Sequence, residues 1–251
     1  MPVEIRGRPP FFRLGPGTSS LDAAWELIDR GRLPVWGSLL MASQSAGRGR
    51  LGRAWQSPAG HVYGALRLPT APPFNGPGAS PALAYLLAEA LADFGWNLAV
   101  KWPNDLIFEG RKVGGLLLEA RREALVAGLG LNLLAPPAGD WQLARDPGAP
   151  PPGALPFPGE PEALWRPLVK SVLLGYNKKF AASGLEALIP LIETRLCWRG
   201  RQVRVERPAA EPPAPENGLA GRLAGLGPEG QLILEAREGR YQLWSGTLSL
   251  L

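Results

Sequence analysis

The residues best suited to bind an anion lie together in residues 44–55. This stretch combines glycines and arginines ahead of a tryptophan: Gly47, Arg48, Gly49, Arg50, Gly52, Arg53 and Trp55. A guanidinium group pairs with two phosphate or carboxylate oxygens at once, and glycine lets the backbone approach a ligand closely. We therefore predict a loop that is mobile when empty and orders around an anion. By itself, the stretch also fits a flexible basic linker or an arginine-glycine tract that contacts RNA without specificity.

Two further segments carry polar residues at turns and strand ends. Residues 101–105 read Lys-Trp-Pro-Asn-Asp, and residues 111–115 add Arg111 and Lys112 before a pair of glycines. Residues 128–132 read Gly-Leu-Gly-Leu-Asn, a short strand that ends in Asn132. Taken alone, the first fits a hairpin corner with solvated lysines, and the second fits a core strand with close packing.

The composition of the 251-residue chain is typical of a soluble globular protein, with 20% charged and 45% hydrophobic residues. A net charge of +5 suits an acidic partner, either nucleic acid or a phosphorylated ligand. One cysteine, Cys197, excludes an internal disulfide and fits a reducing cytosol. Since His61 is the only histidine, a structural zinc site is not expected. A Ser-His-Asp triad would have to use His61 as its base, so this mechanism is not expected either.

The chain shows no sign of targeting or membrane insertion. We find no apolar run long enough to span a bilayer, and residues 1–16 resemble neither a secretory signal nor a transit peptide. The expected location is therefore the cytoplasm. Residues 1–16 contain four prolines, so they should run extended. They are also too short for a DNA-binding helical module.

Helix signals occur at four places. Thr18, Ser19 and Ser20 are N-cap candidates for a short helix whose apolar residues are Leu21, Trp25 and Ile28 and which stops at Gly31. Ser80 followed by Pro81 predicts the start of a longer helix that ends at Gly95. Two more apolar stripes predict helices, with a kink at Pro190 in the second: Leu164, Leu168, Val172 and Tyr176, then Leu185, Leu188, Leu191 and Ile192.

Strand signals are closely spaced before residue 134. They fall at residues 35–42, 61–68, 98–101, 106–108, 111–118 and 125–133. Closely spaced strands with one long helix among them indicate a mostly antiparallel sheet with helices on one side. Residues 135–161 are rich in proline and are predicted to form a surface loop or linker.

The composition changes at Gly200. Short strand-like runs then alternate with glycine-rich turns, as in a small barrel. These runs are residues 202–205, 219–226, 232–235, 241–244 and 247–250. The acidic, proline-rich residues 208–215 are predicted to form an exposed turn.

In this order and spacing, the polar segments resemble the biotin protein ligase family. The resemblance is carried by residues 47–55, 101–105, 111–117 and 128–132. Residues 19–22 (Ser-Ser-Leu-Asp) are similar to the family's Ser-Thr-Asn or Ser-Thr-Met-Asp segment, and residues 218–226, 230–234 and 245–250 to its C-terminal barrel. The resemblance implies an α+β fold. Residues 1–199 would form a class II synthetase-like catalytic domain with a mixed, mostly antiparallel sheet, and residues 200–251 an SH3-like barrel.

The resemblance also implies an activity. Such a ligase activates biotin with ATP as biotinyl-5'-AMP and then transfers the biotinyl group to a lysine of a biotin carboxyl carrier domain. The substrates would be biotin and ATP, with Mg²⁺ carried by the triphosphate and no dedicated protein metal site. A homodimer is compatible with the resemblance. No specific nucleic acid and no membrane is expected as a partner.

By the same resemblance, each substrate has a set of candidate residues. Biotin would contact Ser19, Ser20, Leu21, Gln44, Arg48, Gly49, Arg50 and Lys112. ATP would contact Arg48, Arg50, Trp55, Asn104, Lys112 and Asn132. Catalysis would depend on Lys112, Arg48 and Arg50 around the developing charge, with Asp105 orienting the incoming lysine.

The sequence departs from the family pattern at several points. Leu21 stands where the family often has asparagine, which puts one polar contact to biotin in question, and His61-Val-Tyr replaces the usual Asn-Leu-Tyr. The proline-rich residues 135–161 have no familiar counterpart. Two alternatives remain: a lipoate or octanoate ligase or transferase of the related fold, and an RNA-binding protein that uses its arginines as a phosphate patch.

Overall fold

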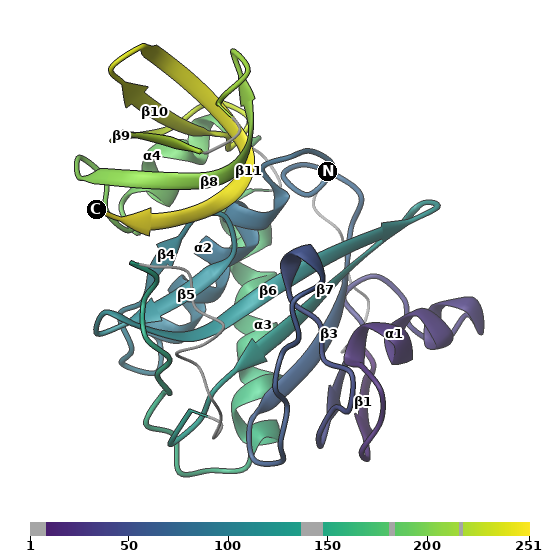
Figure 1. Cartoon of the computed structure of the whole chain (residues 1–251). Coiled ribbons are helices and arrows are strands. Elements are labelled where there is room, and N and C mark those ends of the chain that lie inside the picture. The colour runs from purple at the N-terminus through teal and green to yellow at the C-terminus, as the bar shows by residue number, and fades with distance from the viewer. Residues whose placement is uncertain (1–8, 137–147, 181–183, 216–217) are drawn as a thin grey trace.

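The computed structural model describes residues 9–136, 148–180, 184–215 and 218–251, which form a seven-stranded sheet and a closed barrel (Figure 1). The sheet strands are β1 (Phe11–Leu14), β2 (Ser38–Met41), β3 (Val62–Leu68), β4 (Ala99–Lys101), β5 (Asp105–Phe108), β6 (Arg111–Arg121) and β7 (Ala124–Leu131). The helices are α1 (Ser20–Asp29), α2 (Ala79–Ala92), α3 (Pro161–Lys179) and α4 (Ile189–Glu193), with 3-10 turns η1 (Arg50–Gly52) and η2 (Glu186–Leu188). The barrel strands are β8 (Gln202–Glu211), β9 (Leu219–Leu226), β10 (Leu232–Ala236) and β11 (Gly239–Leu250).

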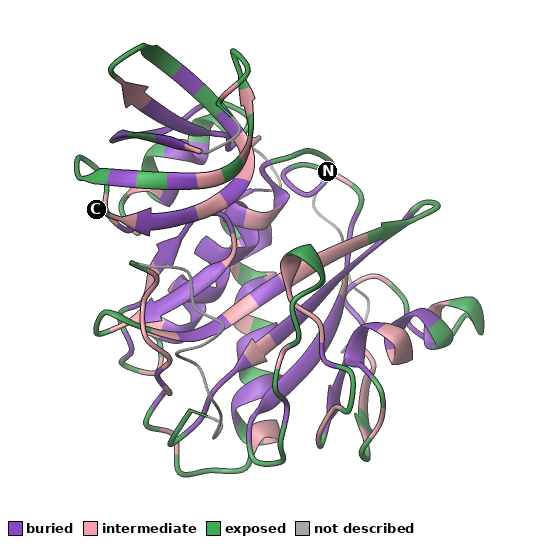
Figure 2. Cartoon of the chain, viewed as in Figure 1, coloured by how far each residue is buried: buried purple, intermediate pink, exposed green. Residues whose placement is uncertain are grey.

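The sheet has the strand order β1-β2-β3-β7-β6-β5-β4. Among the sheet strands within the described residues, only β1 and β2 pair in parallel, and the other pairs are antiparallel. The predicted mixed, mostly antiparallel sheet is therefore confirmed. Figure 2 shows β3 and β7 buried along most of their length, whereas the hairpin between β6 and β7 ends in solvent.

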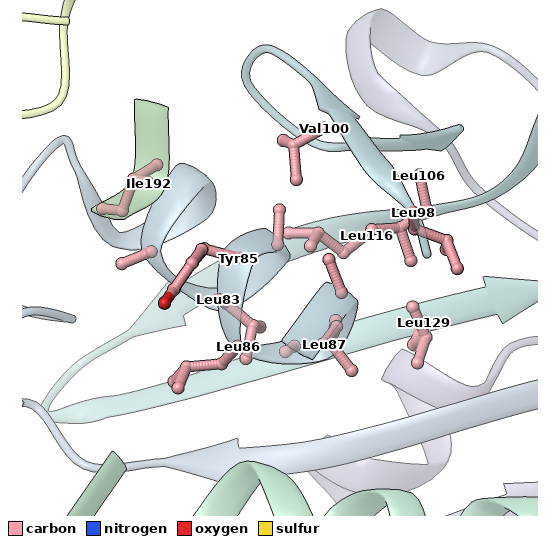
Figure 3. Close-up of a cluster of buried hydrophobic side chains, with 14 of the residues drawn as sticks. Leu83, Tyr85, Leu86, Leu87, Leu98, Val100, Leu106, Leu116, Leu129 and Ile192 are labelled. Atoms are coloured by element: carbon pink, nitrogen blue, oxygen red, sulfur yellow. The ribbon is translucent and has the colours of Figure 1, made fainter. Parts of the chain in front are cut away.

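The two long helices cover one face of the sheet. Leu83 and Leu87 of α2 pack over Leu116 of β6 and Leu129 of β7, as Figure 3 shows. Helix α3 packs beside α2, and its predicted apolar stripe is confirmed because all four stripe residues are buried. A Cβ atom at Gly64 of β3 would lie 2.3 Å from the Trp165 ring, so α3 can reach the sheet only over a glycine.

Helix α1 lies on the opposite face of the sheet. Leu21 and Trp25 pack there with Leu39 and Tyr63, because alternate residues of a strand point to opposite faces. Of the three candidate caps, Ser19 is the one that caps the helix, since its side chain accepts a hydrogen bond from the Leu21 backbone N–H. This face, next to α1, carries the candidate site described below.

Several local predictions were wrong. The strand predicted over residues 35–42 is limited to β2, because Trp36 takes a positive φ of 66° and forms a turn before it. Helix α2 begins at Ala79 behind Gly78, and the Ser80 hydroxyl donates instead to the backbone oxygen of Pro103. Pro190 stands at the start of α4 and therefore separates it from η2 without kinking a longer helix.

Two predicted surface segments are also partly wrong. Within residues 148–160, Leu155 is fully buried and pairs with Leu133, so this part of the proline-rich segment packs against the sheet. In the barrel, β8 continues through Pro208 to Glu211, where an exposed turn was predicted. Strand β11 joins the two predicted runs at residues 241–250 through a bulge around Ser245.

The barrel is closed in the order β10-β11-β8-β9 and is joined to the sheet region by direct contacts. Glu193 of α4 accepts a hydrogen bond from Leu226 N–H at 2.7 Å, and the Trp102 indole N–H donates to the Gly230 oxygen at 3.0 Å. Buried barrel residues such as Leu223 belong to the same hydrophobic cluster as the sheet core. Within the described ranges, no helix is both long and apolar enough to cross a membrane.

Candidate active site

A cavity of about 560 Å³ lies between the sheet, the 44–55 loop and the barrel. All of the residues predicted for the site border it: Ser19, Ser20, Leu21, Gln44, Arg48, Gly49, Arg50, Trp55, Asn104, Asp105, Lys112 and Asn132. These residues come from segments more than a hundred positions apart in the chain, and the sheet brings them to one place.

A polar corner of the cavity is formed where α1 begins. The Ser20 backbone N–H donates to Gln44 Oε1 at 2.7 Å, and Gln44 Nε2 donates to Ser57 Oγ at 2.8 Å. The Gln44 amide is thereby held in one orientation, with one N–H and one oxygen lone pair still open to a ligand. Leu21 is buried beside it and would contact a Cβ at Gly128, so this wall of the cavity is apolar.

The 44–55 loop is a short ribbon that folds back on itself. Arg48 pairs with Ala54, the Gly49 N–H donates to the Arg53 oxygen at 2.7 Å, and the Trp55 N–H donates to the Gly47 oxygen at 2.8 Å. We call residues 47–49 and 53–55 the stem of the loop and η1 (Arg50–Gly52) its tip. Hydrogen bonds across the stem leave the tip as the part that projects.

Arg48 does not point an unpaired charge into the cavity. Its guanidinium donates to both oxygens of Asp22, at 2.9 and 2.8 Å, and to Glu119 at 3.2 Å. The hydrogen bonds to Asp22 raise the pKa of Arg48 and lower the pKa of the Asp22 carboxyl. Both acids lay outside the predicted site.

Arg50 is held far less tightly. Among the residues that the structure describes, its guanidinium makes one long hydrogen bond, 3.4 Å to Asn104 Oδ1, and burial lowers its pKa. Asn104 is itself fixed, because its Nδ2 donates to the Leu116 backbone oxygen at 2.8 Å. A partly buried cation with one weak partner is well suited to an incoming anion.

Asp105 is buried between two lysines. Lys112 Nζ lies 2.6 Å from one carboxylate oxygen and Lys101 Nζ lies 3.4 Å from the other. Burial alone would raise the Asp105 pKa, but the two ammonium groups outweigh it and hold that pKa below its usual range. The cluster carries one net positive charge beside the cavity.

Trp55 covers Lys112 from the side of the loop. The Lys112 ammonium lies 5.4 Å from the centre of the Trp55 ring, within the range of a cation–π contact. A Cβ at Gly130 would lie 2.5 Å from Trp55 Nε1, so the indole rests directly on the backbone of β7. Gly130, the second glycine of residues 128–132, therefore allows this close packing.

Asn132 supports the wall of the site. Its Nδ2 donates to the Gly153 oxygen at 2.9 Å, and the Gly153 N–H donates to the Lys112 oxygen at 2.8 Å. Part of the proline-rich segment thus closes the cavity, which the sequence did not indicate.

Several residues that border the cavity were not predicted as site residues, among them Lys101, Gly246, Thr247 and Leu248. Lys101 could have been found, since it begins the Lys-Trp-Pro-Asn-Asp segment. The other three lie on barrel strand β11, and no local pattern marks them, because only the docking of the barrel brings them to the cavity.

Comparisons with known proteins agree with this geometry. The model of the Biotin/lipoate A/B protein ligase family matches residues 18–133, the range that contains every predicted site residue. The biotin–[acetyl-CoA-carboxylase] ligase of Paracoccus denitrificans is 32% identical over 249 residues, covering 91% of this chain and 90% of the relative. The chain belongs to the biotin protein ligase family.

Two further matches have lower sequence identity. The bifunctional ligase/repressor BirA of Bacillus subtilis is 26% identical, and the match covers 85% of this chain and 66% of that relative's length. The structure of the biotin protein ligase from Aquifex aeolicus in complex with biotin and ATP superimposes with a TM-score of 0.76 at 22% identity. That match covers 96% of this chain and 99% of the other. The fold predicted for this family, a mostly antiparallel sheet followed by a small barrel, is thus confirmed for this chain.

Proposed function

We propose that this family member activates biotin with ATP and transfers the biotinyl group to a lysine of a carrier domain. The observation that carries the proposal is one cavity bordered both by the Ser20–Gln44 polar corner and by the cations Arg50 and Lys112. The named relatives support it, since the Paracoccus protein is a biotin ligase and the Aquifex ligase was solved with biotin and ATP.

In the first step, a biotin carboxylate oxygen attacks the α-phosphorus of ATP, and pyrophosphate leaves. Both reactants are anions, so the barrier falls when fixed cations stabilise the charge that develops between them. Lys112, held by Asp105, and Arg50, held only weakly, are the cations placed for this task. The product is biotinyl-5'-AMP, a mixed anhydride.

In the second step, the amine of a carrier lysine attacks the anhydride carbonyl, and AMP leaves. Asp105 would orient this lysine through charge. Its lowered pKa makes it a weak general base, because a base works best with a pKa near the operating pH. We therefore assign Asp105 an electrostatic role, with the amine losing its proton to solvent.

Magnesium would enter with the nucleotide. Among the described residues, no group of three or more histidine, cysteine, aspartate or glutamate side chains could hold a metal ion. Asp105, the carboxylate that borders the cavity, is already paired with two lysines. This pattern fits a Mg²⁺ ion held mainly by the phosphates of ATP.

The polar corner favours biotin over lipoate. Biotin's ureido group offers both donors and acceptors, which the fixed Gln44 amide and the Ser20 region can match, whereas lipoate ends in an apolar disulfide ring. We further propose that residues 1–199 and 200–251 act as two domains of one site, with β11 closing the cavity.

The test is incubation with ATP, Mg²⁺ and labelled biotin, followed by a biotin carboxyl carrier domain. We expect ATP-dependent pyrophosphate release and then a labelled carrier lysine. Lipoate supplied at the same concentration should not be transferred. Equal transfer of lipoate would contradict the assignment to biotin, and absence of both adenylates would contradict the activity.

A further inference from the structure

We propose that Asp22 and Glu119 are positioning residues that hold the stem of the 44–55 loop through Arg48, so that Arg50 rather than Arg48 meets the anion. This assignment deepens the proposed function, on which its catalytic half rests. It separates two arginines that the sequence pattern treats alike.

The first support is the geometry around Arg48. A two-pronged pair to Asp22 and a third bond to Glu119 use most of the donors of one guanidinium group. To reach an anion in the cavity, Arg48 would have to leave two carboxylates that are held at hydrogen-bonding distance. Such bidentate, charge-assisted pairs are among the stronger polar contacts in proteins.

The second support is that the Glu119 carboxylate is itself fixed by other groups. The Trp25 indole N–H donates to Glu119 at 2.9 Å, and Arg121 pairs with Glu119 at 3.2 Å. The Arg121 guanidinium also lies 4.7 Å from the centre of the Trp25 ring. The network connects α1, β6 and the loop, and its two arginines balance its two carboxylates, so little positive charge is left for a phosphate.

The third support is the contrast with Arg50. The side chains of Arg48, Asp22 and Glu119 are 35%, 37% and 22% exposed, so water screens their contacts only in part. Arg50 has one bond of 3.4 Å, to a neutral amide. Of the two arginines, Arg50 can therefore turn towards a ligand at lower cost.

A mechanical consequence follows for the loop. Because Arg48 is held in place and its neighbours are hydrogen-bonded across the stem, we expect only the tip of the loop, η1, to move when the loop opens. Asp22 and Glu119 would then set the resting position from which the tip closes over the adenylate.

We call the contacts of Arg48 with Asp22 and Glu119 the clamp. The clamp can be tested without substrates by limited trypsin digestion, with cleavage sites mapped by mass spectrometry. Trypsin must take the Arg48 side chain into its specificity pocket, so cleavage after Arg48 requires the clamp to open. We expect Asp22→Asn combined with Glu119→Gln to speed cleavage after Arg48 by about tenfold, because proteolysis tracks the population of the open form. Glu26→Gln, which removes an exposed pair with Arg30 on the same helix, is the matched control.

This digestion contains no biotin or ATP, so its outcome does not depend on the proposed function. Unchanged cleavage after Arg48 in the double variant would overturn the clamp. If that variant fails to fold, Arg48→Lys gives the same test, because an ammonium cannot form the two-pronged pair.

A charge-reversal experiment tests whether Arg48 only positions the loop or itself contacts the anion. In Asp22→Arg with Arg48→Glu, the pair between positions 22 and 48 can form again with its charges reversed, but position 48 now carries a negative charge and its contact with Glu119 is lost. If Arg48 only positions the loop, the reversed pair should recover at least about tenfold of the adenylation rate lost in Arg48→Glu alone. It should also lower the fraction of adenylate released before transfer. No recovery, with thermal stability restored, would show that Arg48 itself meets the anion.

Discussion

The Lys112 ammonium lies 2.6 Å from the Asp105 carboxylate, and that acid is 8% exposed. Because the two lysines keep the pKa of the buried acid below its usual value, Asp105 stays ionised, and its charge holds the Lys112 side chain in one position beside the cavity. Lys101 contacts the other carboxylate oxygen, so the cluster keeps a charge pair even when Lys112 is removed.

Replacing Lys112 with alanine should abolish most adenylate formation while the protein stays folded. Loss of one contact to the transition state typically costs about 3 kcal/mol, on the order of a hundredfold in rate. The measurement is pyrophosphate release with biotin and ATP, together with thermal unfolding. Lys170→Ala, which removes an exposed lysine of α3, is the control. A rate near that of the unaltered protein would remove Lys112 from the site.

Arg50→Gly should weaken closure of the loop tip and release biotinyl-5'-AMP before transfer. The free adenylate would then label lysines of a bystander protein. The same loop should be cut by trypsin at its tip in the free protein and protected by biotin with ATP, since binding an anion offsets the entropy lost when the loop orders. Arg122→Gly is a suitable control, because Arg122 is exposed and its positive φ of 51° accepts glycine. Equal resistance of the loop with and without ligands, and no bystander labelling, would rule out a lid.

Gly130→Ala should displace Trp55, because the new Cβ would lie 2.5 Å from the indole nitrogen. Overpacking of this kind costs about 1–3 kcal/mol, and it would also remove the ring from Lys112. We expect a lower melting temperature, a higher KM for ATP and altered tryptophan fluorescence. Gly15→Ala, where a Cβ meets nothing within 4 Å, should change none of these. Unchanged fluorescence in Gly130→Ala would contradict the close packing.

Stability should depend on His61 at mildly acidic pH. Burial lowers the pKa of this histidine below 6.5, and its Nδ1 accepts a hydrogen bond from Leu133 N–H. In the window between the lowered pKa and 6.5, the unfolded chain binds the proton and the folded chain does not. The free energy of unfolding should therefore rise with pH across that window. His61→Gln should flatten this part of the curve, as measured by urea unfolding at several pH values; an unchanged slope would show that His61 is not its source.

Binding to duplex DNA should be weak and steeply dependent on salt. The basic loop residues serve local contacts, and Arg48 is already neutralised by Asp22 and Glu119. Nonspecific contacts of this kind weaken sharply as salt rises. Fluorescence anisotropy with random and operator-like duplexes at two salt concentrations would measure this. Sequence-specific binding at physiological salt would instead support a regulatory role.

Much of the site could be predicted from the sequence by itself. Residues 44–55, Lys112 and Asn132 have types and spacings suited to anion binding, and the order of strands indicated a mostly antiparallel sheet. Such features are local, since chain propensity, turn residues and side-chain chemistry are carried by a few neighbouring positions. They were sufficient to predict the family.

Only the tertiary structure decided which charges face the ligand. The difference between Arg48, paired with Asp22 and Glu119, and Arg50, almost unpaired, depends on where α1 and β6 lie relative to the loop. The same holds for Thr247 of the barrel at the cavity and for the buried Leu155. Contacts between residues a hundred positions apart leave no trace in a local pattern, because they arise only when the packed core fixes the distances between elements.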